Sequence, residues 1–204
     1  DLTALTNIEA EIGLPQWVFG QSRYAFVGDQ IWFVYRKAGI DRLAILSLDG
    51  QFEQIDIDAT EIESVANYQD GIVATVSSWK AESSVMSITR EGIRPLSKIR
   101  DLNIDESWFP IPQTFTYQTS DSEKAHALFY PPTNPEYEIN EKEKPPLIVL
   151  AHGGPTAAAR RQLQLGITYW TSRGFGVADV DYRGSTGYGR IFRNRLHCLL
   201  YTSD

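Results

Sequence analysis

Residues 147–155 read LIVLAHGGP, a continuous apolar run that leads directly into two adjacent glycines. An apolar run of this length is typical of a strand buried on both faces of a sheet. After it, apolar residues recur at helical spacing over about 157–173, and Gly174 is suited to end that helix. Residues 177–181 form a second apolar run. Strand, helix and strand with short connections make a βαβ unit, so the second half of the chain is predicted to contain a parallel sheet.

The first half follows a different pattern, in which short runs rich in β-branched and aromatic residues alternate with Gly-Asp-type turns. The predicted strands are Arg23–Val27, Ile31–Tyr35, Leu43–Leu48, Phe52–Ile57, Glu63–Tyr68, Ile72–Ser77, Val85–Thr89 and Ile93–Ser97. They fall into two four-strand units of roughly 40 residues, the size of β-propeller blades. Two blades cannot close a ring, so further blades are expected before Asp1. From the pattern alone, a meander sheet or half of a sandwich stays open as an alternative.

Composition narrows the function classes. The chain has 204 residues and a formal net charge of −7, without a Lys/Arg cluster, so nucleic-acid binding lacks its electrostatic signature. The single cysteine, Cys198, and the scattered His126, His152 and His197 form no metal-ligand motif, and no metal is expected. Nothing approaches ~18 consecutive apolar residues, so no membrane span is expected. The chain starts at Asp1, so a missing signal peptide is uninformative, and the cytoplasm is the default location.

The first candidate site is His152-Gly153-Gly154-Pro155, directly after the strand Leu147–Ala151. Paired glycines allow positive φ and a close approach of the backbone to a ligand, with N–H groups free to face a cavity. Fixed donors of this kind stabilise the oxyanion of an acyl-transfer intermediate by roughly 3–4 kcal/mol each. A plain turn between strand and helix is the alternative. The strand before and the helix after favour an oxyanion loop.

The second candidate site is the segment 181–189, DYRGSTGYG, which follows the next predicted strand. Ligand sites in parallel sheets gather at the carboxyl ends of strands, so Tyr182 and Arg183 are candidates for a pocket wall. Ser185 is not predicted to be a nucleophile. A nucleophile elbow would require glycine where Arg183 stands, and a strand leading directly into it.

Together these motifs resemble the start of the catalytic domain of the prolyl oligopeptidase family of serine peptidases, most of all its dipeptidyl aminopeptidase and acylaminoacyl-peptidase branch. The strings that carry the resemblance are AHALFYPPTNP, PPLIVLAHGGPTAAA and YWTSRGFGVADVDYRGSTGYGR, over residues 125–190. The resemblance implies a β plus α/β fold, with the C-terminal blades of a β-propeller before the N-terminal part of an α/β-hydrolase domain. The implied boundaries are 1–107 and 108–204, both incomplete. Residues 197–204 depart from the family pattern and are interpreted as a non-native tail, which puts His197 and Cys198 in doubt.

The resemblance also implies roles for individual residues. The oxyanion donor falls on Gly153 or Gly154, and substrate contacts fall on His152, Pro155, Tyr182 and Arg183. Nothing in the sequence matches the serine, aspartate or histidine of a triad, which in this fold follow in that order with the serine in a Gly-x-Ser-x-Gly elbow. His152 precedes the place of the nucleophile and is not expected to be the base.

The predicted function is therefore that of a fragment of a serine peptidase that hydrolyses short peptides by acyl transfer and is inactive on its own. The resemblance implies no cofactor, and the expected partner is a short peptide, with no nucleic acid and no membrane. Two alternatives stay open: an esterase-type α/β-hydrolase fragment, since ester hydrolysis uses the same oxyanion hole, and a non-catalytic propeller binding module. Cleavage preference and oligomeric state are not specified by the sequence.

Overall fold

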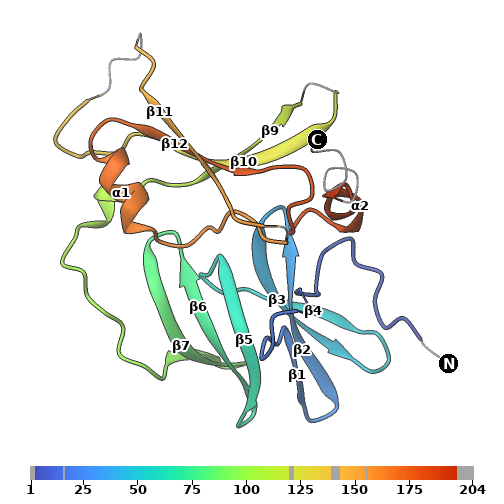
Figure 1. Ribbon diagram of the computed structural model, residues 1–204. Coiled ribbons are helices and arrows are strands. Elements are labelled where there is room, and N and C mark those ends of the chain that lie inside the picture. Colours follow the sequence, from blue (N-terminus) through green and yellow to red (C-terminus); the bar gives the residue numbers. More distant parts are fainter. Residues whose placement is uncertain (1–2, 16, 120–121, 139–142, 155, 197–204) are drawn as a thin grey trace.

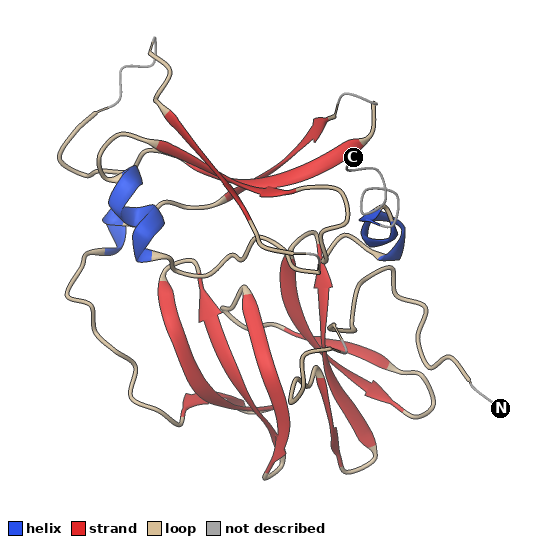
Figure 2. Cartoon of the chain, viewed as in Figure 1, coloured by secondary structure: helices blue, strands red, loops and turns tan. Residues whose placement is uncertain are grey.

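The computed structural model describes residues 3–15, 17–119, 122–138, 143–154 and 156–196. It contains three four-stranded sheets, two short α-helices and one 3₁₀ turn (Figures 1 and 2). The predictions for Pro155 and for the tail 197–204 lie outside the described residues.

The first two sheets are antiparallel meanders, each formed by four consecutive strands. Their strands are β1 Tyr24–Val27, β2 Gln30–Lys37, β3 Ile40–Ser47 and β4 Phe52–Ile55, then β5 Glu61–Tyr68, β6 Gly71–Ser78, β7 Ala81–Thr89 and β8 Gly92–Pro95. The prediction of two antiparallel four-stranded units is confirmed. The described residues form no closed ring of such sheets.

One apolar core joins these two sheets. Trp32, Val34 and Leu43 from the first sheet meet Ile62 and Ile72 from the second, each at most 1% exposed. Side chains alternate between the two faces of a strand, so Trp32 and Val34 of β2 share one face, while Phe33 and Tyr35 pack in a second apolar cluster on the other face. The two sheets therefore stack face to face, as Figure 1 shows.

The third sheet is mixed and has the order β11-β12-β10-β9. Its strands are β9 Gln113–Gln118, β10 Lys124–Tyr130, β11 Leu147–Ala151 and β12 Gly176–Asp181. β11 and β12 run parallel, as the βαβ pattern predicts, whereas β10 is antiparallel to both β9 and β12. Leu128 and Val177 of this sheet pack with Ile167 of the helix α1 Leu165–Thr171.

The prediction that 147–151 is buried on both faces is wrong for the described chain. Leu147 is 56% exposed and Val149 61% exposed. The reason is that β11 pairs with β12 alone and lies at the edge of the sheet, where only Ile148 packs against the core of the third sheet. The second apolar run, Val177–Asp181, is buried as expected.

The predicted helix over 157–173 is also shorter than expected, since only Leu165–Thr171 is helical. The residues before it use their N–H groups for other partners. Ala159 donates to the Asp181 carboxylate at 2.7 Å, Arg161 to Glu61 at 2.9 Å, and Leu163 to the Ser78 carbonyl at 2.7 Å. The predicted C-cap Gly174 is wrong by two residues, since α1 ends at Thr171 with Ser172 as its C-cap; Gly174, at φ +86°, lies in the turn that follows, with its N–H on the Thr171 carbonyl.

Segments 156–163 and 186–193 connect the third sheet to the first two. The Gly187 N–H donates to Glu11 at 2.6 Å, and Arg193 of the helix α2 Arg190–Asn194 pairs with the same carboxylate. Arg160 pairs with Glu63 of β5. The loops at the carboxyl ends of β11 and β12 therefore sit against the stacked sheets (Figure 1).

Candidate active site

The loop that follows β11 holds His152, Gly153 and Gly154. Both glycines are exposed, whereas His152 is half-buried. Neither glycine has a positive φ, so the conformational reason given for them from the sequence is wrong. A Cβ at position 154 would make a tight contact, 3.1 Å from the Tyr182 hydroxyl oxygen. A Cβ on Gly153 would meet nothing within 4 Å.

The N–H groups of these two glycines are the candidate oxyanion donors. Among the described residues, neither N–H donates a hydrogen bond to a backbone or side-chain acceptor. Backbone N–H groups rarely stay unpaired unless water or a ligand can reach them, and here both residues are exposed. The loop therefore presents two donors at the carboxyl end of a parallel strand.

The loop after β12 contains Tyr182, Arg183 and Ser185 and is shaped by glycines at positive φ. Gly184, at φ +97°, is buried, and a Cβ there would lie 2.7 Å from the Leu196 side chain. Arg183 is half-buried in this loop. Ser185 is fully buried, at 0% exposure.

The structure brings the two loops into direct contact. His152 Nε2 lies 2.7 Å from Ser185 Oγ, and the His152 ring stacks on Tyr182 with 4.3 Å between centroids. The Tyr182 hydroxyl donates to the His152 carbonyl at 3.1 Å, and the Thr186 N–H donates to the Ala157 carbonyl at 2.9 Å. His152 and Tyr182 are both predicted substrate contacts, whereas the pairing of His152 with Ser185 is not predicted from the sequence. The sequence did contain a signal for this contact: two parallel strands that are neighbours in the sheet both end in polar loops, and such loops lie close together.

Two carboxylates that are not predicted as site residues, Asp179 and Asp181, are buried at the carboxyl end of β12, next to these loops. Burial raises the pKa of both Asp179 and Asp181. Asp181 accepts from the Ala159 N–H and, at 2.8 Å, from the Tyr188 hydroxyl. Ala159 belongs to the segment that follows the first loop and Tyr188 to the loop after β12, so the Asp181 carboxylate links these two segments.

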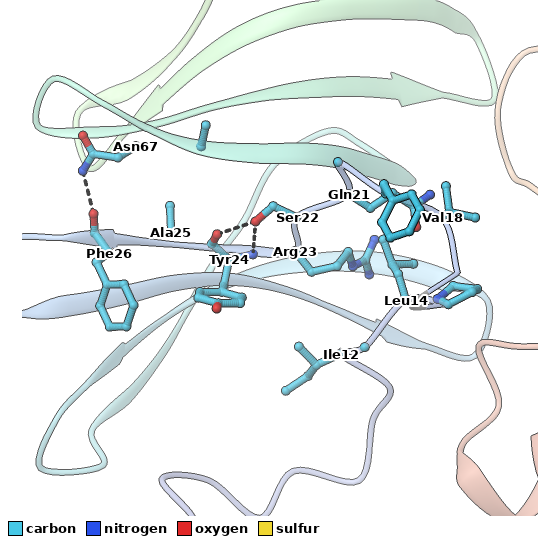
Figure 3. Close-up of a pocket in the computed structure, with 15 residues that line it drawn as sticks. Ile12, Leu14, Val18, Gln21, Ser22, Arg23, Tyr24, Ala25, Phe26 and Asn67 are labelled. Atoms are coloured by element: carbon cyan, nitrogen blue, oxygen red, sulfur yellow. Dashed lines mark hydrogen bonds between the residues drawn. The ribbon is translucent and has the colours of Figure 1, made fainter.

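A polar cavity of about 230 Å³ adjoins the two loops where they meet the stacked sheets. Thr156 and Gly187 line one side, and Arg36 and Glu63 line the other. A larger cavity of about 870 Å³ lies elsewhere, between residues 12–15, residues 18–23, β1 and Asn67 (Figure 3). None of His152, Gly153, Gly154, Tyr182 and Arg183 lines either cavity; the smaller one is next to the two loops through Thr156 and Thr186.

Within the described residues there is no group of three or more His, Cys, Asp or Glu side chains arranged to hold a metal ion. None of the described helices has the length and apolar character needed to cross a membrane.

In comparisons with known proteins, the chain is similar to several peptidases. No protein-family model matches it. A solved puromycin hydrolase superposes with a TM-score of 0.88 at 34% identity, covering 95% of this chain and 30% of that one. The curated dipeptidyl aminopeptidase BIII of Pseudoxanthomonas mexicana is 44% identical over 50 residues, which is 24% of this chain and 7% of that protein. The chain belongs to the prolyl oligopeptidase family.

Membership in the prolyl oligopeptidase family agrees with a more distant structural likeness. The acylaminoacyl peptidase of Pyrococcus horikoshii superposes with a TM-score of 0.69 at 20% identity, which shows a shared fold. The family resemblance inferred from the sequence is confirmed by the likeness to puromycin hydrolase and to the dipeptidyl aminopeptidase. The chain spans about 30% of the length of the solved prolyl oligopeptidase relatives that it matches.

Proposed function

We propose that this chain is part of a serine peptidase that hydrolyses short peptides by acyl transfer, and that it supplies the oxyanion side of the active site. The observation that carries the proposal is the exposed Gly153-Gly154 backbone at the carboxyl end of β11, whose two N–H groups have no acceptor within the described part of the chain. Counted from β9, β11 is the third strand of its sheet, and in α/β-hydrolases the loop after the third strand supplies an oxyanion donor.

The proposed domain organisation supports this role. Residues 1–107 would be β-propeller-like blades, because they form two stacked antiparallel meanders of four strands each. Residues 108–204 would be the beginning of an α/β-hydrolase domain, because their sheet contains the parallel pair β11 and β12 with a helix between them. The proposal places the candidate site where the second unit faces the first.

The chemistry requires donors that are fixed before the substrate arrives. When a nucleophile attacks a peptide carbonyl, negative charge develops on its oxygen, and preorganised N–H groups stabilise this charge more than they stabilise the neutral carbonyl. Gly153 or Gly154 would supply that donor. His152, Tyr182, Arg183 and Pro155 would form the neighbouring wall of the substrate pocket.

The nucleophile of the proposed reaction is not Ser185. Its hydroxyl is fully buried, and it lies in the loop after β12 rather than in a sharp strand-to-helix elbow. The proposal therefore expects the serine, acid and base in the continuation of the encoded chain beyond Leu196. A serine-directed fluorophosphonate should leave the 204-residue chain unlabelled and should label the continued chain at a Gly-x-Ser-x-Gly serine. Labelling at Ser185 would contradict this.

The oxyanion role is tested in the continued chain by Gly154→Val. The added side chain would meet the Tyr182 hydroxyl and displace the loop, so kcat should fall about 100-fold or more while KM changes little. Gly166→Ala in α1 is the matched control, because a Cβ there meets nothing within 4 Å. A change confined to KM would show that the loop is only a structural turn. If the continued chain hydrolyses small esters but cleaves no peptide, the proposed peptidase function is wrong and an esterase function takes its place.

A further inference from the structure

Trp17 is an aromatic side chain from the segment before β1 that reaches the candidate active site. Its indole N–H donates to Thr156 Oγ1 at 3.0 Å. Thr156 follows the Gly153-Gly154 loop by two residues, although it is far from Trp17 in the sequence. The contact therefore places an indole from the first half of the chain beside the candidate oxyanion donors.

The indole of Trp17 has a free apolar surface. Trp17 is 63% exposed, whereas tryptophan is highly buried on average in folded proteins. The Val18 N–H donates to the Pro15 carbonyl at 3.2 Å, which closes a tight turn that carries Trp17. An exposed indole that is held at its nitrogen offers its ring faces to another apolar group, and tryptophans of this kind are common anchors in binding sites.

The indole lies at a suitable distance from the donors to contact a bound peptide. Gly154 and Thr156 are two residues apart, so their Cα atoms are separated by at most about 7 Å. Successive residues of an extended peptide are about 3.3 Å apart. A peptide whose scissile carbonyl oxygen lies at the Gly153 or Gly154 N–H therefore brings the side chains next to the scissile bond within reach of the Trp17 indole.

The surroundings of Thr156 favour an apolar substrate group over a charged one. Leu14, from the same segment as Trp17, lines the cavity of about 230 Å³ together with Thr156, Ala157 and Ala158. A charged substrate group would compete with existing ion pairs in this cavity, whereas an apolar side chain would not. Each charged side chain that lines the cavity already has a partner, in the pairs Arg23–Asp41, Arg36–Glu61, Arg160–Glu63 and Glu11–Arg193.

We propose that Trp17 is a specificity-determining residue, whose exposed indole binds an aromatic or large apolar side chain of the peptide next to the scissile bond. The preferred substrates are then short peptides that carry such a residue beside the bond that is cleaved. The place of the scissile bond rests on the proposed function, whereas the binding of an aromatic side chain to Trp17 is measurable in the 204-residue chain.

The first measurement follows binding without catalysis. The ¹⁵N-labelled 204-residue chain is titrated with Gly-Phe amide and, separately, with Gly-Ala amide. The indole N–H signal of Trp17, assigned by its loss in Trp17→Phe, should shift with Gly-Phe amide and shift much less with Gly-Ala amide. The indole signal of Trp32, which is 1% exposed, should stay constant and is the internal control. A Trp17 signal that stays constant, or that shifts equally with both amides, would overturn the proposal.

The second measurement follows specificity in the continued, active chain. It compares kcat/KM for pairs of peptides that differ only by phenylalanine or alanine, first on one side of the scissile bond and then on the other. The unsubstituted chain should prefer phenylalanine on one side. Trp17→Ala should lower kcat/KM for that phenylalanine peptide about 10-fold and leave its alanine counterpart nearly unchanged, since contacts in an apolar pocket discriminate substrates by factors of this size.

Two further variants show whether the preference belongs to Trp17. Thr156→Val removes the acceptor of the indole N–H and should cause a smaller loss of the same preference. Phe19→Ala is the matched control, because Phe19 lies on the same segment, is 93% exposed and lines the larger cavity instead; it should leave the preference unchanged. If Trp17→Ala slows both peptides equally, the indole only holds its segment against the loop, and the proposal is wrong.

The two measurements also separate this proposal from the proposed function. If the Trp17 signal responds to Gly-Phe amide but the continued chain cleaves no peptide, the aromatic site stands and the peptidase function is refuted. If the continued chain cleaves peptides with no preference that depends on Trp17, the peptidase function stands and the role of Trp17 is refuted.

Discussion

Replacement of Asp41 by asparagine should strongly destabilise the chain, because this buried carboxylate neutralises two arginines at once. Its side chain has no exposed surface. Arg23 donates to both carboxylate oxygens, at 2.8 and 2.9 Å, and Arg36 Nε donates at 2.8 Å. The Ile62 N–H of β5 donates to it as well, so the carboxylate also connects the two stacked sheets.

The magnitude follows from the pKa of Asp41 and from what the substitution leaves behind. Burial alone would raise this pKa, but hydrogen bonds and charges from Arg23 and Arg36 outweigh burial and lower it from 3.8 to about 2. That difference corresponds to roughly 2.5 kcal/mol of stability at neutral pH. Asp41→Asn leaves the buried Arg23 guanidinium without its counter-charge, whereas Arg36 keeps its ion pair with Glu61; about 3–5 kcal/mol is typical for a buried pair broken on one side. For a chain of this size the melting temperature should fall by roughly 10 °C.

The assay is urea unfolding followed by tryptophan fluorescence, since Trp32 is 1% exposed in the shared core of the two sheets. Asp29→Asn, at an exposed turn position, is the matched control and should change stability by less than about 0.5 kcal/mol. The depressed pKa of Asp41 means that its contribution is present above pH 3.8 and is lost as the pH falls towards 2. The free energy of unfolding of the unsubstituted chain should fall over this pH range, whereas that of Asp41→Asn should not show this fall. A loss below about 1 kcal/mol, with acid dependence unchanged, would refute the argument.

Three further substitutions test the packing. Gly71→Ala should lower the stability of the chain in thermal unfolding by about 1–3 kcal/mol, because the new Cβ would lie 2.1 Å from the Ile88 carbonyl oxygen. Gly13→Ala is the control, because a Cβ there meets nothing within 4 Å, and an equal loss of stability in both variants would contradict this reason. Ser87→Ala should leave stability equal or slightly higher, because it removes a buried hydroxyl without a hydrogen-bond partner among the described residues; a loss above about 1 kcal/mol would reveal a missing partner. Val149→Lys on the exposed edge strand β11 should reduce self-association in sedimentation velocity, and unchanged association would place the contact elsewhere.

The strands were predictable because their signals are local. Turn residues such as Asp49-Gly50 and Asp70-Gly71 separate runs of β-branched and aromatic residues, and the observed strands begin and end close to the predicted ones. The short helix α1 was not predictable in length. The helical spacing extends back to about residue 157, but the N–H groups of 159–163 pair with Asp181, Glu61 and Ser78 instead. Because these acceptors are distant in the sequence, the local hydrophobic periodicity does not reveal that they compete with the helix.

The candidate site was predictable in its position but not in its internal contacts. His152-Gly153-Gly154 stood out because two glycines follow an apolar run, and β11 does end there. The pairing of His152 with Ser185 depends on the register of β11 against β12, which sets the two loops side by side. Register between parallel strands separated by a helix cannot be counted from sequence spacing. The prediction that β11 is buried on both faces was wrong, because an apolar run does not reveal which strands and helices pack beside it.

The fastening of segments 156–163 and 186–193 to the stacked sheets has a consequence for how the chain can be divided. The segment between β8 and β9 joins the first two sheets covalently to the third, while Arg160, Arg193 and the Leu163 N–H form noncovalent links across the same junction. A nick at an exposed position such as Arg100 should therefore leave both pieces associated. The two pieces would then behave as a complementing pair, whose reassembly reports on the junction and weakens as salt screens its ion pairs.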